Sequence, residues 1–142
     1  MRYKTASALL IAASAFYMQP AAAATIELTS QLSTAQEVPA VQGSGKGQLA
    51  ATLDTNTSEL RWKLTYSGLS GPATAGHFHG PATKGETAGV AIGFKGNLES
   101  PITGEATLTP VQMGELMNGR WYVNIHTAQN PKGEIRGQIM TK

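Results

Sequence analysis

Apolar and polar residues alternate in short runs over most of the chain, and this pattern predicts β-strands. In Leu60–Tyr66 the large apolar residues recur at every second position, with Arg61 and Lys63 between them, which places the two sets on opposite faces of a strand. Clusters of Gly, Pro, Ser and Asn separate the runs. The predicted strands are Ile26–Ser33, Gly45–Leu53, Glu59–Tyr66, Ala75–His79, Val90–Phe94, Gly104–Leu108, Arg120–His126 and Glu134–Met140.

One helix is predicted at Pro110–Met117. Thr109 can act as its N-cap, Pro110 occupies the first helical position and Gln112 completes a capping box. Asn118-Gly119 supplies the stop.

The apolar residues of this helix are Val111, Met113, Leu116 and Met117. We expect them to pack the helix onto the sheet, since methionine is usually a core filler. As an alternative, Met113 and Met117 stand four positions apart and offer thioethers to Cu(I).

Eight short strands and one short helix predict an all-β Greek-key β-sandwich or flattened barrel of about eight antiparallel strands, with the helix as a crossover. Alternation assigns the core-facing residues most clearly in the central strands and in the last strand. The expected core anchors are Trp62, Phe78, Trp121, Val123, Ile125, Ile135 and Ile139.

The first 24 residues have the pattern of a secretory signal peptide. Arg2 and Lys4 precede a short apolar stretch, and Ala22-Ala23-Ala24 resembles a cleavage site. The stretch is too short to span a bilayer, which takes about 20 residues, and no second such run follows. We therefore expect cleavage near Ala24, a single domain over residues 25–142, and a periplasmic or secreted location.

Charge excludes one class of partner. The chain has 11 Lys and Arg against 9 Asp and Glu, but two of the bases lie in the predicted signal peptide. The remaining domain is balanced at 9 and 9, so we expect no binding to nucleic acid. The chain has no cysteine, which excludes disulfides, thiol nucleophiles and a blue-copper centre.

The three histidines are the strongest candidates for chemistry. His77 and His79 form a His-x-His pair, so on a strand they project from one face about 6.6 Å apart. His126 ends another predicted strand, where it shares a face with Tyr122 and Asn124. All three lie opposite the apolar set, which favours a three-nitrogen metal site over three unrelated surface histidines.

The affinity order of divalent metals favours copper at such a site, with zinc as the other candidate. The last strand places Glu134 and Arg136 on its polar side, and Asn130-Pro131-Lys132-Gly133 predicts a hairpin that brings Arg136 toward His126. Glu37 and Glu134 are candidates to orient a histidine or to act as a fourth ligand.

Other catalytic classes find little support in the sequence. There is no glycine-rich phosphate loop after a strand, and the serines lie in loops without a nucleophile elbow. Asp54 is the only aspartate, beside a turn, and nothing places it behind a histidine. No catalytic residue is assigned, and the question of enzymatic activity stays open.

Four segments carry a family resemblance. They are Gln36–Pro39, Gly76–Ala82, Tyr122–Thr127 and Pro131–Ile139. Together they closely resemble the CHRD domain, a family named for its occurrence in chordin and also found singly in bacterial exported proteins. The resemblance covers about Ile26 to Ile139 and implies either an exported binding domain or an extracellular protein-interaction module.

The histidine pattern also resembles, more distantly, that of copper-zinc superoxide dismutases. Those enzymes carry a His-x-His pair on a barrel strand, a later Gly-Arg strand ending in a copper-binding histidine, and an arginine that guides the anion. The resemblance implies copper ligands at His77, His79 and His126 and an anion-facing Arg136. Asn124, on the same strand face as His126, is a further candidate to support the site. The chain lacks the bridging histidine, the zinc histidines and the cysteine pair.

We therefore expect an exported domain that binds one copper ion for buffering or delivery. Two alternatives remain: a metal-independent interaction module, and a copper redox enzyme of the superoxide dismutase type.

Overall fold

The structure is a computed structural model that describes residues 24–142. The predicted signal peptide lies outside the described residues, apart from Ala24. Over the described range the strands are β1 (Thr25–Ser33), β2 (Lys46–Asp54), β3 (Glu59–Ser67), β4 (Ala73–His79), β5 (Val90–Gly93), β6 (Ile102–Thr107), β7 (Tyr122–Thr127), β8 (Ile135–Gln138) and β9 (Met140–Thr141), together with the short 3₁₀ helix η1 (Thr34–Gln36) and the helix α1 (Pro110–Met117).

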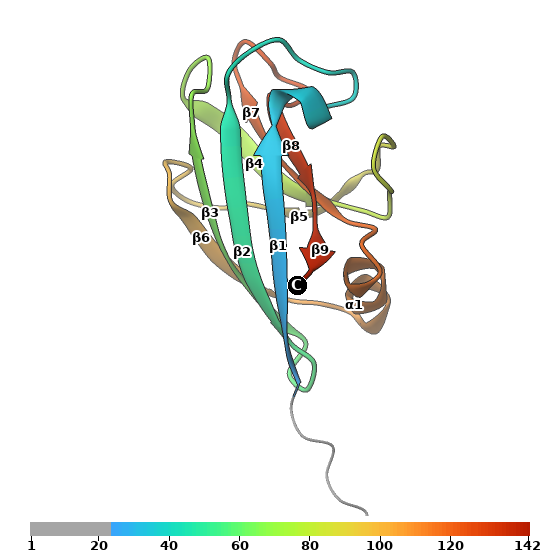
Figure 1. Cartoon of the computed structure of the whole chain (residues 1–142). Coiled ribbons are helices and arrows are strands. Elements are labelled where there is room, and N and C mark those ends of the chain that lie inside the picture. Colours follow the sequence, from blue (N-terminus) through green and yellow to red (C-terminus); the bar gives the residue numbers. More distant parts are fainter. Residues whose placement is uncertain (1–23) are drawn as a thin grey trace, which may run out of the picture.

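The strands curl into one antiparallel sheet that forms a nearly closed barrel, with α1 on its outside (Figure 1). The strand order is β5-β4-β7-β8-β1-β2-β3-β6, and β9 pairs with β1. The predicted all-β fold with about eight antiparallel strands and one short helix is confirmed. The predicted strand Glu134–Met140 is instead two strands, β8 and β9. The strand is interrupted at Ile139, whose N–H donates to the Trp121 carbonyl.

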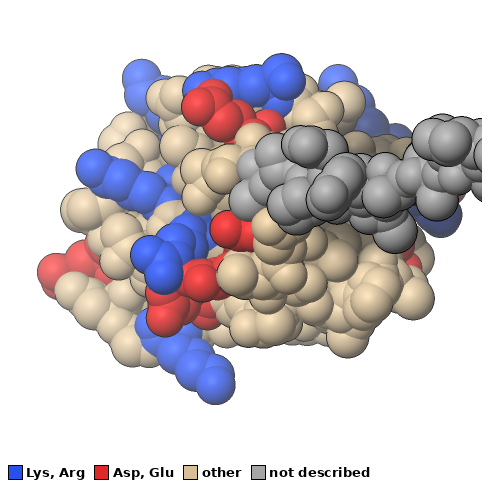
Figure 2. Space-filling model, turned by 90° about the horizontal axis from the view of Figure 1, so that it is seen from below, with Lys and Arg blue, Asp and Glu red and all other residues tan. Residues whose placement is uncertain are grey.

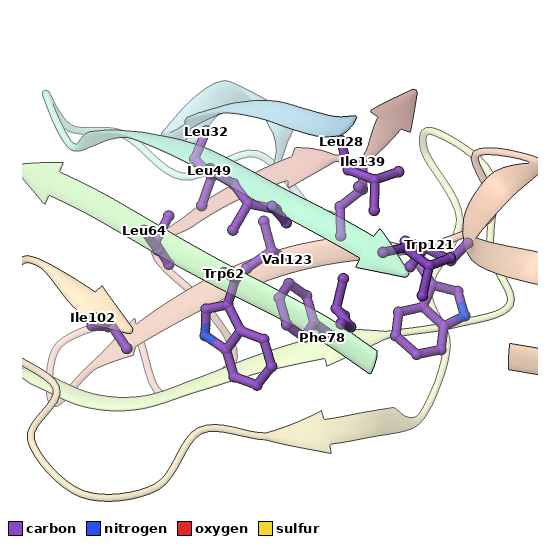
Figure 3. Packing of buried hydrophobic residues seen from close by; sticks show 14 of the residues in the cluster. Leu28, Leu32, Leu49, Trp62, Leu64, Phe78, Ile102, Trp121, Val123 and Ile139 are labelled. Carbon is purple, nitrogen blue, oxygen red and sulfur yellow. The ribbon is translucent and has the colours of Figure 1, made fainter. Parts of the chain in front are cut away.

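Alternation in β3 shows how the core is built. Leu60, Trp62 and Leu64 are buried while Arg61 and Lys63 are exposed, as a period of two requires. The expected core anchors are all buried, and several of them, among them Trp62 and Phe78, are labelled in Figure 3. Trp62 meets Phe78 edge to face at 5.0 Å between ring centroids, a favourable aromatic geometry.

The helix begins and ends where predicted. Thr109 and Gln112 form the capping box, and the left-handed φ of +68° at Gly119 follows the helix. Leu116 is fully buried, but Val111 is 69% exposed, so the expectation that Val111 packs the helix is wrong. At 100° per residue Val111 points about 140° away from Leu116 around the helix axis, toward solvent.

The methionines of α1 also separate. Met113 packs against the core, whereas Met117 is 37% exposed. The packing role predicted for both methionines therefore holds for Met113 and only in part for Met117.

Charges of both signs are interspersed on the face seen in Figure 2. Arg61 lies between Glu59 and Glu105, and Lys142 pairs with Glu27. Within residues 24–142 no helix is long and apolar enough to cross a membrane.

The barrel has one seam. Strands β5 and β6 stand at the two ends of the strand order and do not pair with each other within the described residues. Trp62 of β3 stacks on Phe94, just after β5, with 5.5 Å between ring centroids. Aromatic packing therefore closes the barrel at the seam where backbone hydrogen bonds do not.

Candidate metal centre

Strands β4 and β7 bring the three histidines together. In their antiparallel register His77 lies opposite Asn124, and His126 lies opposite Ala75, two residues before His77. The ring centroid of His77 is 5.4 Å from that of His79 and 4.8 Å from that of His126. One nitrogen from each of the three rings falls within 4.8 Å of the others. The structure thus places all three predicted ligands in one cluster.

The face that carries the histidines is polar, as predicted, but it is not open to solvent. His79 is 8% exposed and His126 is 9% exposed. Two loops cover this face: residues 34–45, which contribute Glu37, and residues 80–89, which contact His79 and Arg136. His77 remains partly exposed, so access to the cluster is from the side of His77.

Backbone carbonyls fix the tautomers of two histidines. Nδ1 of His79 lies 3.0 Å from the Ala88 carbonyl oxygen, and Nδ1 of His126 lies 2.9 Å from the Pro131 carbonyl oxygen. A carbonyl only accepts, so each Nδ1 must carry the proton and donate it. Nε2 of each ring then keeps a free lone pair, which is the arrangement found behind metal-bound histidines.

The free nitrogens converge. Nε2 of His126 lies 3.0 Å from Nδ1 of His77. Metal–nitrogen bonds of about 2.0–2.1 Å in a tetrahedral site separate two nitrogens by about 3.3 Å. The spacing of these two rings therefore suits a shared metal ion, and His79 completes the group of three.

Burial favours the neutral imidazoles that metal binding requires. It lowers the pKa of His77, and the neighbouring His126 and His79 lower it further. Burial also lowers the pKa of His79, although its contacts with Ala88 and Asn124 oppose the change. Both rings are therefore neutral near pH 7 and available as ligands.

A stack of three side chains supports His79. The Tyr122 ring is parallel to the His79 ring within 3°, at 4.7 Å between centroids. The guanidinium of Arg136 lies over the Tyr122 ring, 3.6 Å from its centroid, and donates a hydrogen bond to the Thr83 carbonyl. Arg136 is 2% exposed, so it is buried as part of this stack. The predicted hairpin of β7 and β8 is present, with Arg136 opposite Asn124.

The two glutamate candidates lie in different surroundings. Glu37 is buried beside Asn124 and Arg136; burial raises its pKa to about 7, although Arg136 and a hydrogen bond with Asn124 oppose the rise. Glu134 accepts hydrogen bonds from Ser70, Thr127 and Asn130 instead. None of these partners of Glu134 is a histidine, so of the two only Glu37 lies within the surroundings of the cluster.

Sequence reasoning missed the carbonyls of Ala88 and Pro131. A backbone carbonyl belongs to every residue, so no residue type marks one that orients a histidine. The nearest signal is the turn after His126. Pro131 follows His126 by five positions, and the turn brings its carbonyl back to the His126 ring.

Comparison with known proteins agrees with these motifs. The model of the family described as "CHRD domain" matches residues 28–139. The chain is 30% identical to chordin of Xenopus laevis over 109 residues, which is 71% of this chain but 12% of chordin. No solved structure matches. The family model covers most of the chain, and we conclude that it belongs to the CHRD domain family.

Proposed function

We propose that this CHRD domain is exported and binds one copper ion through His77, His79 and His126, for copper buffering or delivery. One observation carries this function. Carbonyl oxygens hold the Nδ1 protons of His79 and His126, and the unprotonated Nε2 of His126 lies 3.0 Å from Nδ1 of His77, a distance suited to a shared metal.

Copper follows from the donor set. Three neutral imidazoles bind Zn(II), Ni(II) and Cu(II), and at a given site Cu(II) binds most tightly. Zinc is therefore the metal to compete against copper. An exported domain without cysteine has no thiolate for Cu(I), so the imidazoles are its main ligands.

A Cu(II) titration of the protein, followed by electron paramagnetic resonance, tests this function. The matched variant replaces His77, His79 and His126 by alanine and so removes every imidazole in the chain. The expected result is one Cu(II) per chain with hyperfine structure from nitrogen, absent in the variant. Equal binding by both proteins would show that copper does not use these histidines.

A metal-independent interaction module is the second candidate. The outer edges of β5 and β6 are unpaired within the described residues, and such edges can pair with a strand of another protein. Native protein that is isolated without metal and ignores added Cu(II) would favour this candidate.

A further inference from the structure

We propose that the side-chain oxygen of Asn124 is a fourth ligand of the same metal ion. This assignment rests on the proposed function and completes its coordination sphere. Oδ1 of Asn124 lies 3.0 Å from Nε2 of His79 and 3.0 Å from Nε2 of His126. The side chain is only 3% exposed, so no bulk water competes for this position.

Counting protons shows that these atoms lack a partner. The Nδ1 protons of His79 and His126 go to backbone carbonyls, so both Nε2 atoms are acceptors, and Oδ1 is an acceptor as well. His77 can donate one proton to Nε2 of His126. Nε2 of His79 and Oδ1 of Asn124 still face each other at 3.0 Å with no proton between them. A bound cation satisfies both, whereas facing buried acceptors cost free energy.

The surroundings of Asn124 hold the amide in this orientation. Rotating the amide by 180° would point its NH₂ group at the two histidines and remove the conflict. The other end of the amide, however, faces Glu37, and its hydrogen bond with that carboxyl is among the effects that hold the pKa of Glu37 down. Rotation would turn the amide oxygen toward the carboxyl and lose this hydrogen bond.

Gly133 is part of this arrangement. Its φ is +127°, and a Cβ there would stand 2.4 Å from Oε1 of Glu37 and 2.8 Å from Nδ2 of Asn124. Only glycine leaves room for both groups. The position of the Asn124 amide is thus determined by the turn at Gly133, by the buried Glu37 carboxyl and by the strand register that places Asn124 opposite His77.

A ligand set of three nitrogens and one oxygen fills four positions with protein atoms. A site whose four positions are all filled by protein atoms only keeps the metal bound, whereas a catalytic site leaves one position for water or substrate. The inferred set therefore fits buffering or delivery and predicts that no exchangeable water occupies the fourth position.

The test uses Asn124→Ala and Asn124→Asp, with Gln129→Ala as a control that removes an exposed amide beside the same surface hollow as Glu37 and Gly133. Cu(II) affinity is measured by competition, and pulsed electron paramagnetic resonance in D₂O detects a bound water. In the wild type we expect no water ligand. Asn124→Ala should bind Cu(II) at least about tenfold more weakly and gain a water ligand, while Asn124→Asp, which keeps an oxygen, should bind at least as tightly as the wild type.

The outcomes separate the two proposals. A wild-type protein that binds no copper overturns the proposed function and this assignment together. A wild type that binds copper through the histidines but carries an exchangeable fourth water overturns the Asn124 assignment alone. Wild-type affinity in folded Asn124→Ala would also overturn that assignment alone. The water measurement on the wild type decides even if Asn124→Ala does not fold.

Discussion

The two faces of strands β4 and β7 are both buried, but in different ways. On the inner face Phe78, Val123 and Ile125 pack into the barrel core and are at most 1% exposed. On the outer face, His79 and Asn124 are buried under two loops and have polar neighbours for most of their hydrogen-bonding atoms. One pair of strands thus separates an apolar interior from a small polar one.

The difference teaches what each kind of burial requires. Apolar side chains gain free energy simply by leaving water. Polar side chains lose it unless each donor and acceptor finds a partner. The outer face therefore depends on specific covering segments, and the free acceptors that remain there are the best indication of a ligand.

The largest expected effect is on the inner face. Trp121 is fully buried and lies against Gly80, where a Cβ would come within 2.2 Å of its ring. Trp121→Ala should lower the free energy of unfolding by about 3–5 kcal/mol, through lost transfer energy and a cavity. Denaturant unfolding of metal-free protein measures it.

An intermediate effect follows from Glu37 on the outer face, whose pKa rises from 4.5 to about 7 on burial. Below pH 4.5 the carboxyl is protonated in both the folded and the unfolded state and costs nothing. Between pH 4.5 and 7 the unfolded chain ionises first, so folding stability falls by up to about 3 kcal/mol. Glu37→Gln should remove this fall.

The lowered pKa values of His77 and His79 act in the opposite direction, because protonation of the unfolded chain below about pH 6.5 destabilises the fold. Subtracting the pH profile of the Glu37→Gln variant from that of the wild type cancels this contribution. Urea unfolding over the range from about pH 4 to about pH 8 measures both profiles. A difference that is constant across this range would contradict the burial of Glu37.

A smaller effect is expected from His77→Ala, the outer-face counterpart of the Trp121 change. His77 is partly exposed and makes one side-chain hydrogen bond, to His126. Its loss should cost about 1 kcal/mol in metal-free protein, measured by denaturant unfolding. A cost equal to that of Trp121→Ala would mean that the outer face is as essential to folding as the core.

The smallest effect is expected at a position buried on neither face. Val111 on α1 is 69% exposed, so Val111→Ala should change the free energy of unfolding by less than about 0.5 kcal/mol. Thermal unfolding measures it. A larger loss would place a partner on that side of the helix.

Local patterns made much of the fold predictable. The capping box of Thr109 and Gln112 lies within four residues, and the helix has the predicted bounds. Alternation in β3 and β7 identified the core side correctly, because the period of a strand is a property of the backbone. Val111 was misjudged because hydrophobicity alone does not say which side of a short helix faces the sheet.

The candidate site was predictable only in part. The sequence indicated that His77, His79 and His126 share a face, and strand register brings them together. It could not show that residues 34–45 and 80–89 fold over that face, since loop positions depend on contacts between distant segments. For the same reason Glu37 and Glu134 looked equivalent, although only Glu37 lies beside Asn124.

The seam of the barrel has a consequence for how an ion would enter and leave. Strand β4, which carries His77 and His79, is held on one side by long β7 pairing and on the other only by the four-residue β5. An edge element with few hydrogen bonds opens at a lower free energy than the whole domain. Opening of β5 would free the Gly93 side of His77, and it would also part Phe94 from Trp62 at the seam. The exchange rate of a bound ion would then be set by the opening of one short edge strand and its aromatic contact, rather than by unfolding of the whole domain.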